Sequence, residues 1–303
     1  MRIINIKDKD FELIHEPLCA AIGNFDGVHI GHQKLIEESK RHGLKSAILT
    51  FYPHPSIFLK NIKEYKLLTP MEHKADLFSR MGIDYLIIIE FNTEIANLDK
   101  DEFINWMKKL NIKACVCGHD FSFGAKALGT PFDLYRHFET YIINKYSVNN
   151  VRVSTSYIKE LLDQGNVEYA NKLLGRDFSI RGKVVYGSQE GRLIGFPTAN
   201  IDYRNYYLPI NGVYFVGVKL NNVLYYGMCN VGNNPTFNYS YTKRLEVHVF
   251  GLNEDIYGQN VEVFFFKNIR KEIKFKSKEE LVEQLNKDKL ECYRLSSNMN
   301  YTK

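Results

Sequence analysis

The sequence is poor in cysteine and tryptophan and contains no long apolar run. Its five cysteines are odd in number and form no CxxC pair, so a disulfide framework is not expected and a reducing compartment is favoured. No stretch approaches the roughly 18 apolar residues of a membrane-spanning helix. Residues 1–16 carry charges where a signal peptide needs an apolar core. We therefore expect a soluble, cytoplasmic protein without a membrane partner.

Other signatures are missing as well. The chain has no internal repeat, no low-complexity tract and no block of like charges, which argues against repeat architectures and charged interaction tails. The formal net charge of +5 comes from 40 basic and 35 acidic residues spread along the chain. Such an excess suits phosphate-bearing small ligands as well as RNA, and does not choose between them. The signature GxxxxGK[ST] is also missing, which excludes a P-loop kinase.

The chain is long enough for two domains. It has 303 residues, 45% of them hydrophobic and 25% charged, which is the composition of an ordinary globular protein. Because domains usually hold about 100–200 residues, two hydrophobic cores are expected. The pattern of predicted elements changes near residue 176, so we predict domains over residues 1–176 and 177–303.

The first domain alternates short apolar runs with amphipathic helical patterns. Two of the helices begin with capping sequences, TPME at 69–72 and TPFD at 130–133, each with Thr at the N-cap and Pro at the first helical position. Another short helix is expected over 166–174. The alternation predicts a doubly wound α/β fold with a parallel sheet. The apolar runs predict strands over 18–22, 47–52, 85–89, 114–117 and 151–153.

The second domain has a different pattern. From residue 178 onward, short segments rich in Val, Tyr and Phe alternate with period two and are separated by turn signals. A helical pattern returns only at 278–290. We therefore expect an antiparallel sheet or barrel followed by a terminal helix. The clearest predicted strands cover 212–218, 223–228, 245–250 and 261–266.

A glycine-containing turn, GNFDGVHIGH at 23–32, follows the first predicted strand of the α/β pattern. In a parallel sheet this turn presents backbone N–H groups and a helix dipole to an anion, and glycines let a phosphate approach the backbone. His29 and His32 are three residues apart at a helix start, so both imidazoles can face one phosphate. Two alternatives stay open: histidines that merely satisfy a turn, and a zinc pair, although no third ligand follows at a recognised spacing.

The same turn closely resembles the HxGH signature of the nucleotidyltransferase superfamily, and its longer form is similar to the prokaryotic FAD synthetases. The resemblance implies that His29 and His32 stabilise charge on the α-phosphate of ATP while the phosphate of FMN attacks and pyrophosphate leaves. It also implies that the turn binds ATP through Gly23, Asn24, Phe25, Asp26 and Gly31.

Residues 153–159, VSTSYIK, resemble a second signature of that family, ISSTxIR. Tyr157 and Lys159 depart from the family pattern, and a lysine offers a point charge in place of a bidentate fork. We still expect phosphate binding here. Without the family, Ser-Thr-Ser before a helix is more often a simple cap. The resemblance implies ATP contacts from Arg152, Thr155 and Ser156.

A third stretch, GHDFSFG at 118–124, resembles the GxDFxFG loop of the same family, which lies near the flavin and the nucleotide. His119 and Ser122 differ from the commoner residues at their positions. Aromatic rings in such a loop are available for stacking on a flavin. The resemblance implies that the flavin site is lined by Asp120, Phe121 and Phe123.

The second domain opens with a glycine-spaced loop between two predicted strands, RGKVVYGSQEGRLIGFPTAN at 181–200. Such a loop can wrap a phosphate chain with backbone donors. The loop and its GFPTAN end closely resemble riboflavin kinase, whose fold is a small six-stranded antiparallel barrel. The resemblance implies that Thr198 and Asn200 hold the ATP phosphates and Mg²⁺, or another divalent cation, through side-chain oxygens. Further implied ATP contacts are Gly182, Gly187, Gly191, Gly195 and Pro197.

One more match to riboflavin kinase, LEVH at 245–248, contains a candidate catalytic base. Glu246 occupies the family position whose carboxylate accepts the proton as the riboflavin 5′-hydroxyl attacks the γ-phosphate of ATP. On spacing alone, Glu246 is an outward polar residue of an alternating strand. The surrounding family match favours the catalytic interpretation.

Together the matches cover residues from about 18 to 290 and predict a bifunctional enzyme that converts riboflavin to FMN and FMN to FAD. ATP, riboflavin and FMN are the expected ligands, with FMN and FAD as substrate and product and not as prosthetic groups. No nucleic acid is expected. Two alternatives remain: a riboflavin kinase with a decayed adenylyltransferase site, and a regulatory flavin- or RNA-binding protein. The sequence does not indicate the oligomeric state.

Overall fold

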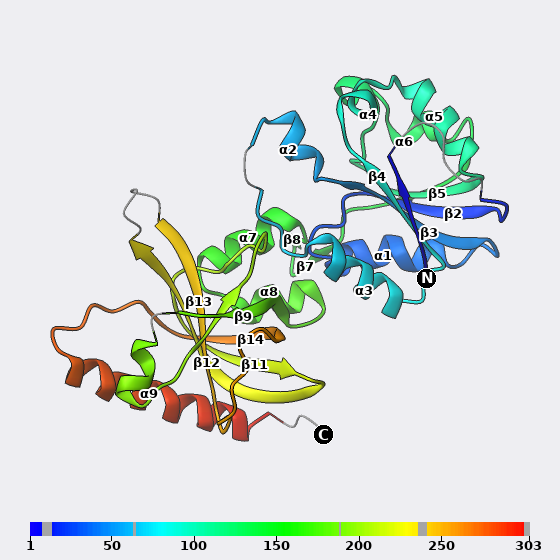
Figure 1. The fold of residues 1–303 in the computed structure, drawn as a ribbon. Coiled ribbons are helices and arrows are strands. Elements are labelled where there is room, and N and C mark those ends of the chain that lie inside the picture. Colours follow the sequence, from blue (N-terminus) through cyan, green and yellow to red (C-terminus); the bar gives the residue numbers. More distant parts are fainter. Residues whose placement is uncertain (8–13, 63–64, 188, 236–240, 300–303) are drawn as a thin grey trace. The chain divides into compact units, whose positions relative to one another are not determined.

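The computed structural model describes residues 1–7, 14–62, 65–187, 189–235 and 241–299. The chain forms two compact units, Met1–Thr155 and Ser156–Lys303, drawn in Figure 1. Among the described residues, no helix combines the length and the apolar character needed to cross a membrane.

The first unit is built on a parallel sheet with the strand order β1-β4-β3-β2-β5-β6. Strand β2 is buried along its full length, as expected for a parallel strand that is covered on both faces. The strands are β1 (Arg2–Ile6), β2 (Leu18–Ile22), β3 (Lys45–Tyr52), β4 (Tyr85–Glu90), β5 (Ile112–Gly118) and β6 (Glu139–Ile143).

Helices cover both faces of this sheet, and each face has its own hydrophobic cluster. Leu18, Ala20 and Ile22 of β2 pack in one cluster with residues of α5. The intervening Cys19 and Ala21 pack in the other cluster with residues of α1 and α3. This confirms the predicted doubly wound fold. The helices are α1 (Ile30–Ser39), α2 (Pro55–Leu59), α3 (Met71–Arg80), α4 (Thr93–Asn97), α5 (Lys100–Lys109) and α6 (Pro131–Leu134).

The first unit differs from prediction in its edge strands, at residues 151–153 and at the start of α3. Strands β1 and β6 were not predicted and lie at the two ends of the sheet. The predicted strand at 151–153 is not part of this sheet, because β8 (Val151–Arg152) pairs antiparallel with β7 (Ser147–Val148). Asn149 and Asn150 join them with positive φ angles, which favours a tight hairpin. Helix α3 has Pro70 at its N-cap without a side-chain cap bond, whereas Thr130 caps α6 in a capping box as predicted.

The second unit is a closed antiparallel barrel of six strands in the order β10-β13-β12-β11-β14-β9. Its period-two alternation arises because successive side chains point into and out of the barrel. The barrel confirms the prediction for this half of the chain. The strands are β9 (Phe178–Val185), β10 (Ala199–Asp202), β11 (Gly212–Leu220), β12 (Val223–Pro235), β13 (Tyr241–Val249) and β14 (Asn260–Lys271).

A terminal helix, α9 (Lys278–Ser297), lies along the outside of the barrel over β11 and β12 (Figure 1). It begins at the predicted residue and runs seven residues beyond the predicted end at 290. An ion pair between Arg270 of β14 and Asp288 of α9, at 2.8 Å, fastens the helix to the barrel. Asp288 is buried, and a buried carboxylate needs such a partner.

Two more helices, α7 (Thr155–Asp163) and α8 (Val167–Leu174), lie between the first sheet and the barrel in the chain. Helix α8 packs against β9 and β14, and the compact units divide between Thr155 and Ser156. By packing, both helices therefore belong almost entirely with the barrel. The boundary at 176/177 stays a prediction about where the two activities divide.

Candidate functional site

The turn at 23–32 lies where the order of the parallel sheet reverses. Strand β2 has β3 on one side and β5 on the other, and both pairs are parallel. The turn after β2 and the loop after β5 therefore leave the same edge of the sheet from neighbouring strands. In open α/β sheets, ligands bind at this topological switch point. The fold thus brings two of the three predicted motif segments of the first unit together.

The turn itself has a strained backbone. Phe25 and Val28 have φ angles of 51° and 42°, and Gly27 between them has a φ of 85°. Glycine tolerates this region, whereas a β-branched residue such as valine is a true outlier there. Such strain costs about 1–3 kcal/mol per residue and persists only where the surroundings over-determine the conformation.

Several hydrogen bonds hold the strained turn. The amide of Val28 donates to Phe25 O at 3.1 Å, and the side chain of Gln33 donates to Val28 O at 3.0 Å. The side chain of Lys74 in α3 donates to Asn24 O at 2.9 Å. Phe25 itself is buried and packs edge-on against Phe78. The turn is therefore anchored both by polar contacts and by a core aromatic ring.

His29 and His32 face each other, as their spacing predicts. Their rings stack with centroids 3.6 Å apart. Nδ1 of His29 accepts a hydrogen bond from His32 N at 3.2 Å and so caps α1. Because Nδ1 accepts, the proton of a neutral His29 ring is on Nε2, which is then a donor. A Cβ on Gly31 would lie 3.2 Å from the His29 ring, so glycine keeps this space open.

Asp26 is buried and acts as a structural link. Its Oδ1 accepts from Thr69 N at 3.1 Å, and its backbone carbonyl accepts from Thr155 Oγ1 at 2.9 Å. Thr155 is the first residue of α7 and belongs to the predicted ATP-binding segment at 153–159. That segment is therefore joined to the turn through Thr155. Ser156 follows it on the same helix, as the first residue of the second unit.

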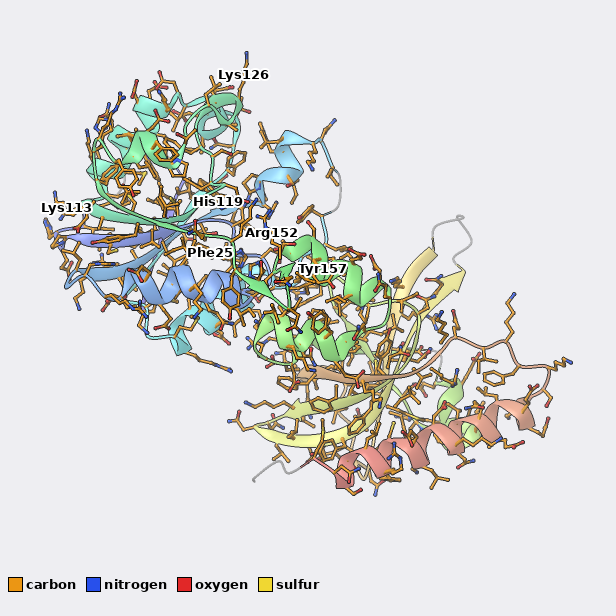
Figure 2. All side chains as sticks on the ribbon, turned by 180° about the vertical axis from the view of Figure 1, so that it is seen from behind. Phe25, Lys113, His119, Lys126, Arg152 and Tyr157 are labelled. Atoms are coloured by element: carbon orange, nitrogen blue, oxygen red, sulfur yellow. The ribbon has the colours of Figure 1, made fainter. Side chains whose placement is uncertain are left out.

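The loop after β5 is linked to the same region. Asp120 forms an ion pair with Arg152 of β8, and Figure 2 shows neighbouring His119 and Arg152 on the same part of the first unit. Burial raises the pKa of the Asp120 carboxyl, but the Arg152 hydrogen bond and charge outweigh it and lower that pKa overall. A predicted flavin-binding residue and a predicted ATP-binding residue are thus paired with each other.

The two aromatic residues of this loop differ in exposure. Phe121 is partly exposed, whereas Phe123 is 5% exposed and packs in the core against Phe103, with centroids 5.2 Å apart. A ring buried in this way has no free face for stacking. The predicted flavin contact of Phe121 fits its position, and the burial of Phe123 favours a core role for that residue.

In the barrel, strand register brings the predicted kinase residues together. Asn200 of β10 is paired with Glu246 of β13, and Glu246 is paired with Asn230 of β12. Directly opposed residues of antiparallel strands have their Cβ atoms about 4.5–5.5 Å apart on the same face. Arg244 lies 3.4 Å from Glu246 and supplies it with a cation. The candidate base and the candidate metal ligand are therefore neighbours.

The glycine-spaced loop packs closely against Asn200 and against its own later residues. A Cβ on Gly187 would lie 2.0 Å from the Asn200 amide, and a Cβ on Gly191 would lie 2.3 Å from Phe196 O. Gly195 ends the short 3-10 helix η2 (Glu190–Ile194) with a φ of 80°. Gly182 lies inside β9, where a Cβ would meet the backbone of Asp202 at 2.4 Å. Close strand packing thus explains Gly182 without a ligand.

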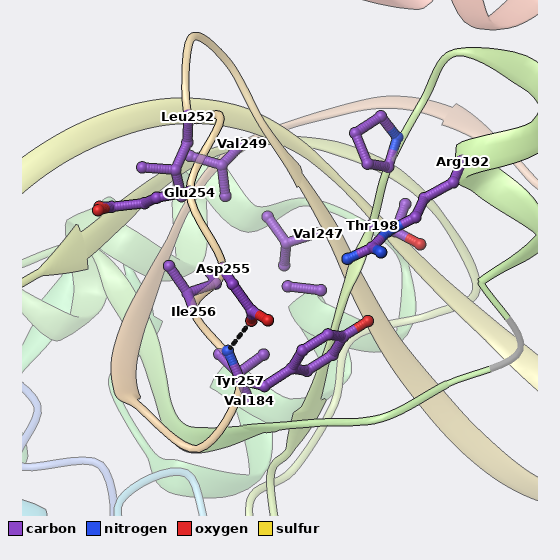
Figure 3. Close-up of a pocket in the computed structure, with 12 residues that line it drawn as sticks. Val184, Arg192, Thr198, Val247, Val249, Leu252, Glu254, Asp255, Ile256 and Tyr257 are labelled. Carbon is purple, nitrogen blue, oxygen red and sulfur yellow. Dashed lines mark hydrogen bonds between the residues drawn. The ribbon is translucent and has the colours of Figure 1, made fainter.

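Two hollows of the barrel unit adjoin these residues. Figure 3 shows the first, in which Thr198 and Arg192 lie opposite the ring of Tyr257. The second is lined by Asn200, Gly187 and Arg244. Thr198 and Asn200 therefore open toward different hollows, although they are two residues apart. The carbonyl oxygen of Pro197 accepts a hydrogen bond from His248 Nδ1 at 2.7 Å, and this contact shapes the loop.

Three residues of these sites were not predicted. Lys74 of helix α3 is 2% exposed and contacts the turn at 23–32 through Asn24. Arg244 and Tyr257 adjoin the barrel hollows. Nothing local in the sequence marks Lys74, because its contact to Asn24 depends on the packing of α3 against the sheet.

Among the described residues, no three His, Cys, Asp or Glu side chains gather as they would around a metal ion.

Comparisons with known proteins agree for the two halves of the chain. A family model described as FAD synthetase matches residues 12–160, and one described as riboflavin kinase matches residues 174–295. Curated relatives bear the name bifunctional riboflavin kinase/FMN adenylyltransferase. The relative from Bacillus subtilis is 41% identical over 92% of each chain, that from Listeria monocytogenes is 38% identical over 88% of this chain and 89% of its own, and that from Escherichia coli K12 is 34% identical over 91% of each.

A solved structure from Streptococcus pneumoniae has the same fold over nearly the full chain. It is titled a macrolide-efflux protein, has a TM-score of 0.86 and 32% identity, and the match covers 95% of this chain and 97% of that one. The efflux title belongs to that protein. The family models and the curated relatives agree with each other on a different activity.

Proposed function

The chain belongs to the bifunctional riboflavin kinase/FMN adenylyltransferase family, and from this premise we propose which residues perform each of its two reactions. The chain phosphorylates riboflavin to FMN and adenylylates FMN to FAD, with ATP as the donor in both steps. The alternatives of a kinase alone or of a non-enzymatic binder are not favoured, because both family models match.

We assign adenylyl transfer to the turn after β2. An oxygen of the FMN phosphate attacks the α-phosphorus of ATP, and the bond to the pyrophosphate leaving group breaks. The Nε2 donor of His29 and the ring of His32 stabilise the charge that develops on the α-phosphate. The attacking phosphate is already anionic, so positioning and electrostatics carry the catalysis. The convergence of the turn, Thr155 and the Arg152–Asp120 pair supports this assignment.

We assign riboflavin phosphorylation to Asn200 and Glu246, which are paired across strands β10 and β13 of the barrel. The riboflavin 5′-oxygen attacks the γ-phosphorus of ATP, its proton passes to the Glu246 carboxylate, and ADP leaves. Arg244, 3.4 Å from Glu246, lies beside this carboxylate and forms a charge-assisted contact with it. The pairing of Asn200 with Glu246 is the observation that carries this assignment.

We further propose that this site takes Mg²⁺ or a similar hard divalent cation. The amide oxygen of Asn200, beside Glu246, fits such an ion, which prefers oxygen ligands and is usually bound through few side chains together with substrate phosphates. Thr198, the other predicted ligand, lines a different hollow, so we assign its hydroxyl to the ATP phosphates and not to the ion. The close approach of Gly187 to Asn200 leaves no room for a Cβ. When bound, the cation would neutralise charge on the ATP phosphates.

A cytoplasmic location is part of the proposal. All five cysteines are free and buried, and free thiols persist in a reducing compartment.

One assay tests the assignment of both activities. The purified chain is incubated with ATP and Mg²⁺ and either riboflavin or FMN, and the flavins are separated by chromatography. We expect FMN and then FAD from riboflavin, and FAD from FMN. A chain that makes no FAD from FMN would contradict the assignment of the first unit.

A further inference from the structure

A buried lysine lies behind the turn that carries His29 and has no part in the chemistry assigned above. Lys74 is 2% exposed, on the buried face of α3 that also carries Phe78. Lysine is almost never fully buried unless it is paired. Its Nζ donates to Asn24 O at 2.9 Å, so the cation is directed at the start of the turn. Such a residue calls for an explanation beyond core packing.

Lys74 belongs to a group of buried polar residues beneath the turn, which we call the clamp. Asp26 is 2% exposed, and its charge favours the protonated form of Lys74. Thr69 N donates to Asp26 Oδ1 at 3.1 Å. Thr50, fully buried, donates from Oγ1 to Asn24 O at 3.4 Å. The clamp thus consists of Asp26, Thr50, Thr69 and Lys74, contributed by the turn and by three other segments of the first unit.

The clamp acts on the most strained part of the unit. Phe25, Gly27 and Val28 all have positive φ angles, and this conformation must be held by its surroundings. Lys74 contributes a charge-assisted hydrogen bond, which is roughly twice as strong as a neutral one. The bond is made at Asn24, directly before the strained residues. A lost Lys74 contact would therefore let the turn relax and would move His29.

We propose that Lys74 is a positioning residue for adenylyl transfer, whose ammonium group, facing Asp26, holds residues 24–28 in the shape that presents His29 to ATP. This inference rests on the proposed role of the turn. Lys74 acts through the backbone and touches no reacting atom.

The first test compares both activities of the full chain in Lys74→Met. The FMN adenylylation kcat falls by roughly 10–100-fold, because small displacements of catalytic groups cost that much. Riboflavin phosphorylation in the same preparation keeps its kcat and serves as the control for folding and concentration. The double variant Asp26→Asn/Lys74→Met removes both charges and stays slow, since the clamp bond to Asn24 is still missing. An unchanged adenylylation kcat in Lys74→Met would overturn the proposal.

The second test uses pH and does not depend on a destabilised variant. Burial lowers the pKa of Lys74 to about 8, against the opposing charge of Asp26. Asp26 also acts on Tyr65, whose pKa is raised by burial and by that same charge. The adenylylation kcat of the unmodified chain therefore falls as the pH rises through about 8. Riboflavin phosphorylation does not share this decline.

Lys74→Arg separates a positioning charge from simple packing, because a guanidinium stays protonated over this range. The variant retains adenylylation and loses the decline near pH 8. A decline that persists unchanged in Lys74→Arg would overturn the proposal even if Lys74→Met were inactive. An unmodified chain that makes no FAD from FMN would instead refute the proposed function, so the two failures can be told apart.

Discussion

The two proposed sites of this chain are assembled in opposite ways. The first is built around one contiguous turn, whose backbone is strained and whose neighbours hold it from beneath. The second is spread across neighbouring barrel strands, where register alone places Asn200 beside Glu246. A strained turn depends on the buried residues that hold its backbone in place. Residues that strand register places side by side depend on their own side chains. The first site should therefore respond to substitutions that never touch substrate.

The largest effect is expected at the barrel site, where we propose that the Glu246 carboxylate accepts the proton. Glu246→Gln keeps the shape and the hydrogen bonding of the side chain but removes the base. Riboflavin phosphorylation should fall by roughly 10²–10⁴-fold, while FMN adenylylation is unchanged. Steady-state rates with each flavin measure both. Glu279→Gln, an exposed change in the first turn of α9, is the matched control, and equal loss of both activities in Glu246→Gln would contradict the division between the units.

At the first site, His29 caps α1 and is also the residue to which we assign charge stabilisation on ATP, and two substitutions separate these roles. His29→Asn keeps a side-chain cap, since asparagine is among the best N-cap residues, but removes the imidazole. Adenylylation should fall by roughly 10²–10³-fold in both His29→Asn and His29→Ala, with riboflavin phosphorylation intact. Rates and thermal melts of the two variants provide the measurement. Full activity of His29→Asn would show that the cap was the only role.

A smaller effect tests whether riboflavin phosphorylation depends on the position of the Asn200 side chain. A Cβ on Gly187 would lie 2.0 Å from the Asn200 amide and would push it aside. Because the displaced atom is the end of a side chain, Gly187→Ala should slow riboflavin phosphorylation about tenfold with little change in the melting temperature. Asn200→Ala should have a similar effect. A fully active Gly187→Ala would argue that Asn200 does not need its observed position.

The smallest effect concerns stability and pH in the first unit. The pKa of Lys74 is lowered from 10.5 to about 8 on folding, so the unfolded chain binds more protons between these values. Stability therefore rises with pH there, by about 1 kcal/mol between pH 8 and 9 from this group. Below pH 8 the cost of burying the charge is fully present. Denaturant melts measure the free energy of unfolding of the unmodified chain and of Lys74→Met at several pH values in this range. This free energy should rise more steeply with pH in the unmodified chain, and parallel pH profiles would contradict the assigned pKa.

The sequence predicts what depends on local pattern. The doubly wound unit, the barrel, the Thr130 cap and the pairing of His29 with His32 all follow from spacing and capping. The strand expected at 151–153 was wrong, since an Asn-Asn hairpin takes these residues out of the sheet. Edge strands β1 and β6 escaped prediction because an edge strand has a weaker apolar pattern than a central one.

Contacts made by tertiary packing could not be predicted. Lys74 reaches Asn24 only because α3 packs beneath the turn, and Phe123 is buried because the loop after β5 folds onto Phe103. The neighbourhood of Arg244 and Glu246 depends on their shared face of β13. The family resemblance pointed to Glu246, whereas the strand register explains why Asn200 lies next to it.

A mixing experiment tests the central claim, that each unit carries one reaction, most directly. His29→Asn and Glu246→Gln are incubated separately and together with riboflavin, ATP and Mg²⁺, and FAD is measured by chromatography. Alone, His29→Asn should stop at FMN and Glu246→Gln should leave riboflavin unconverted. Mixed, they should produce FAD through free FMN. FAD formation by either variant alone at the unmodified rate, or none in the mixture, would contradict the account.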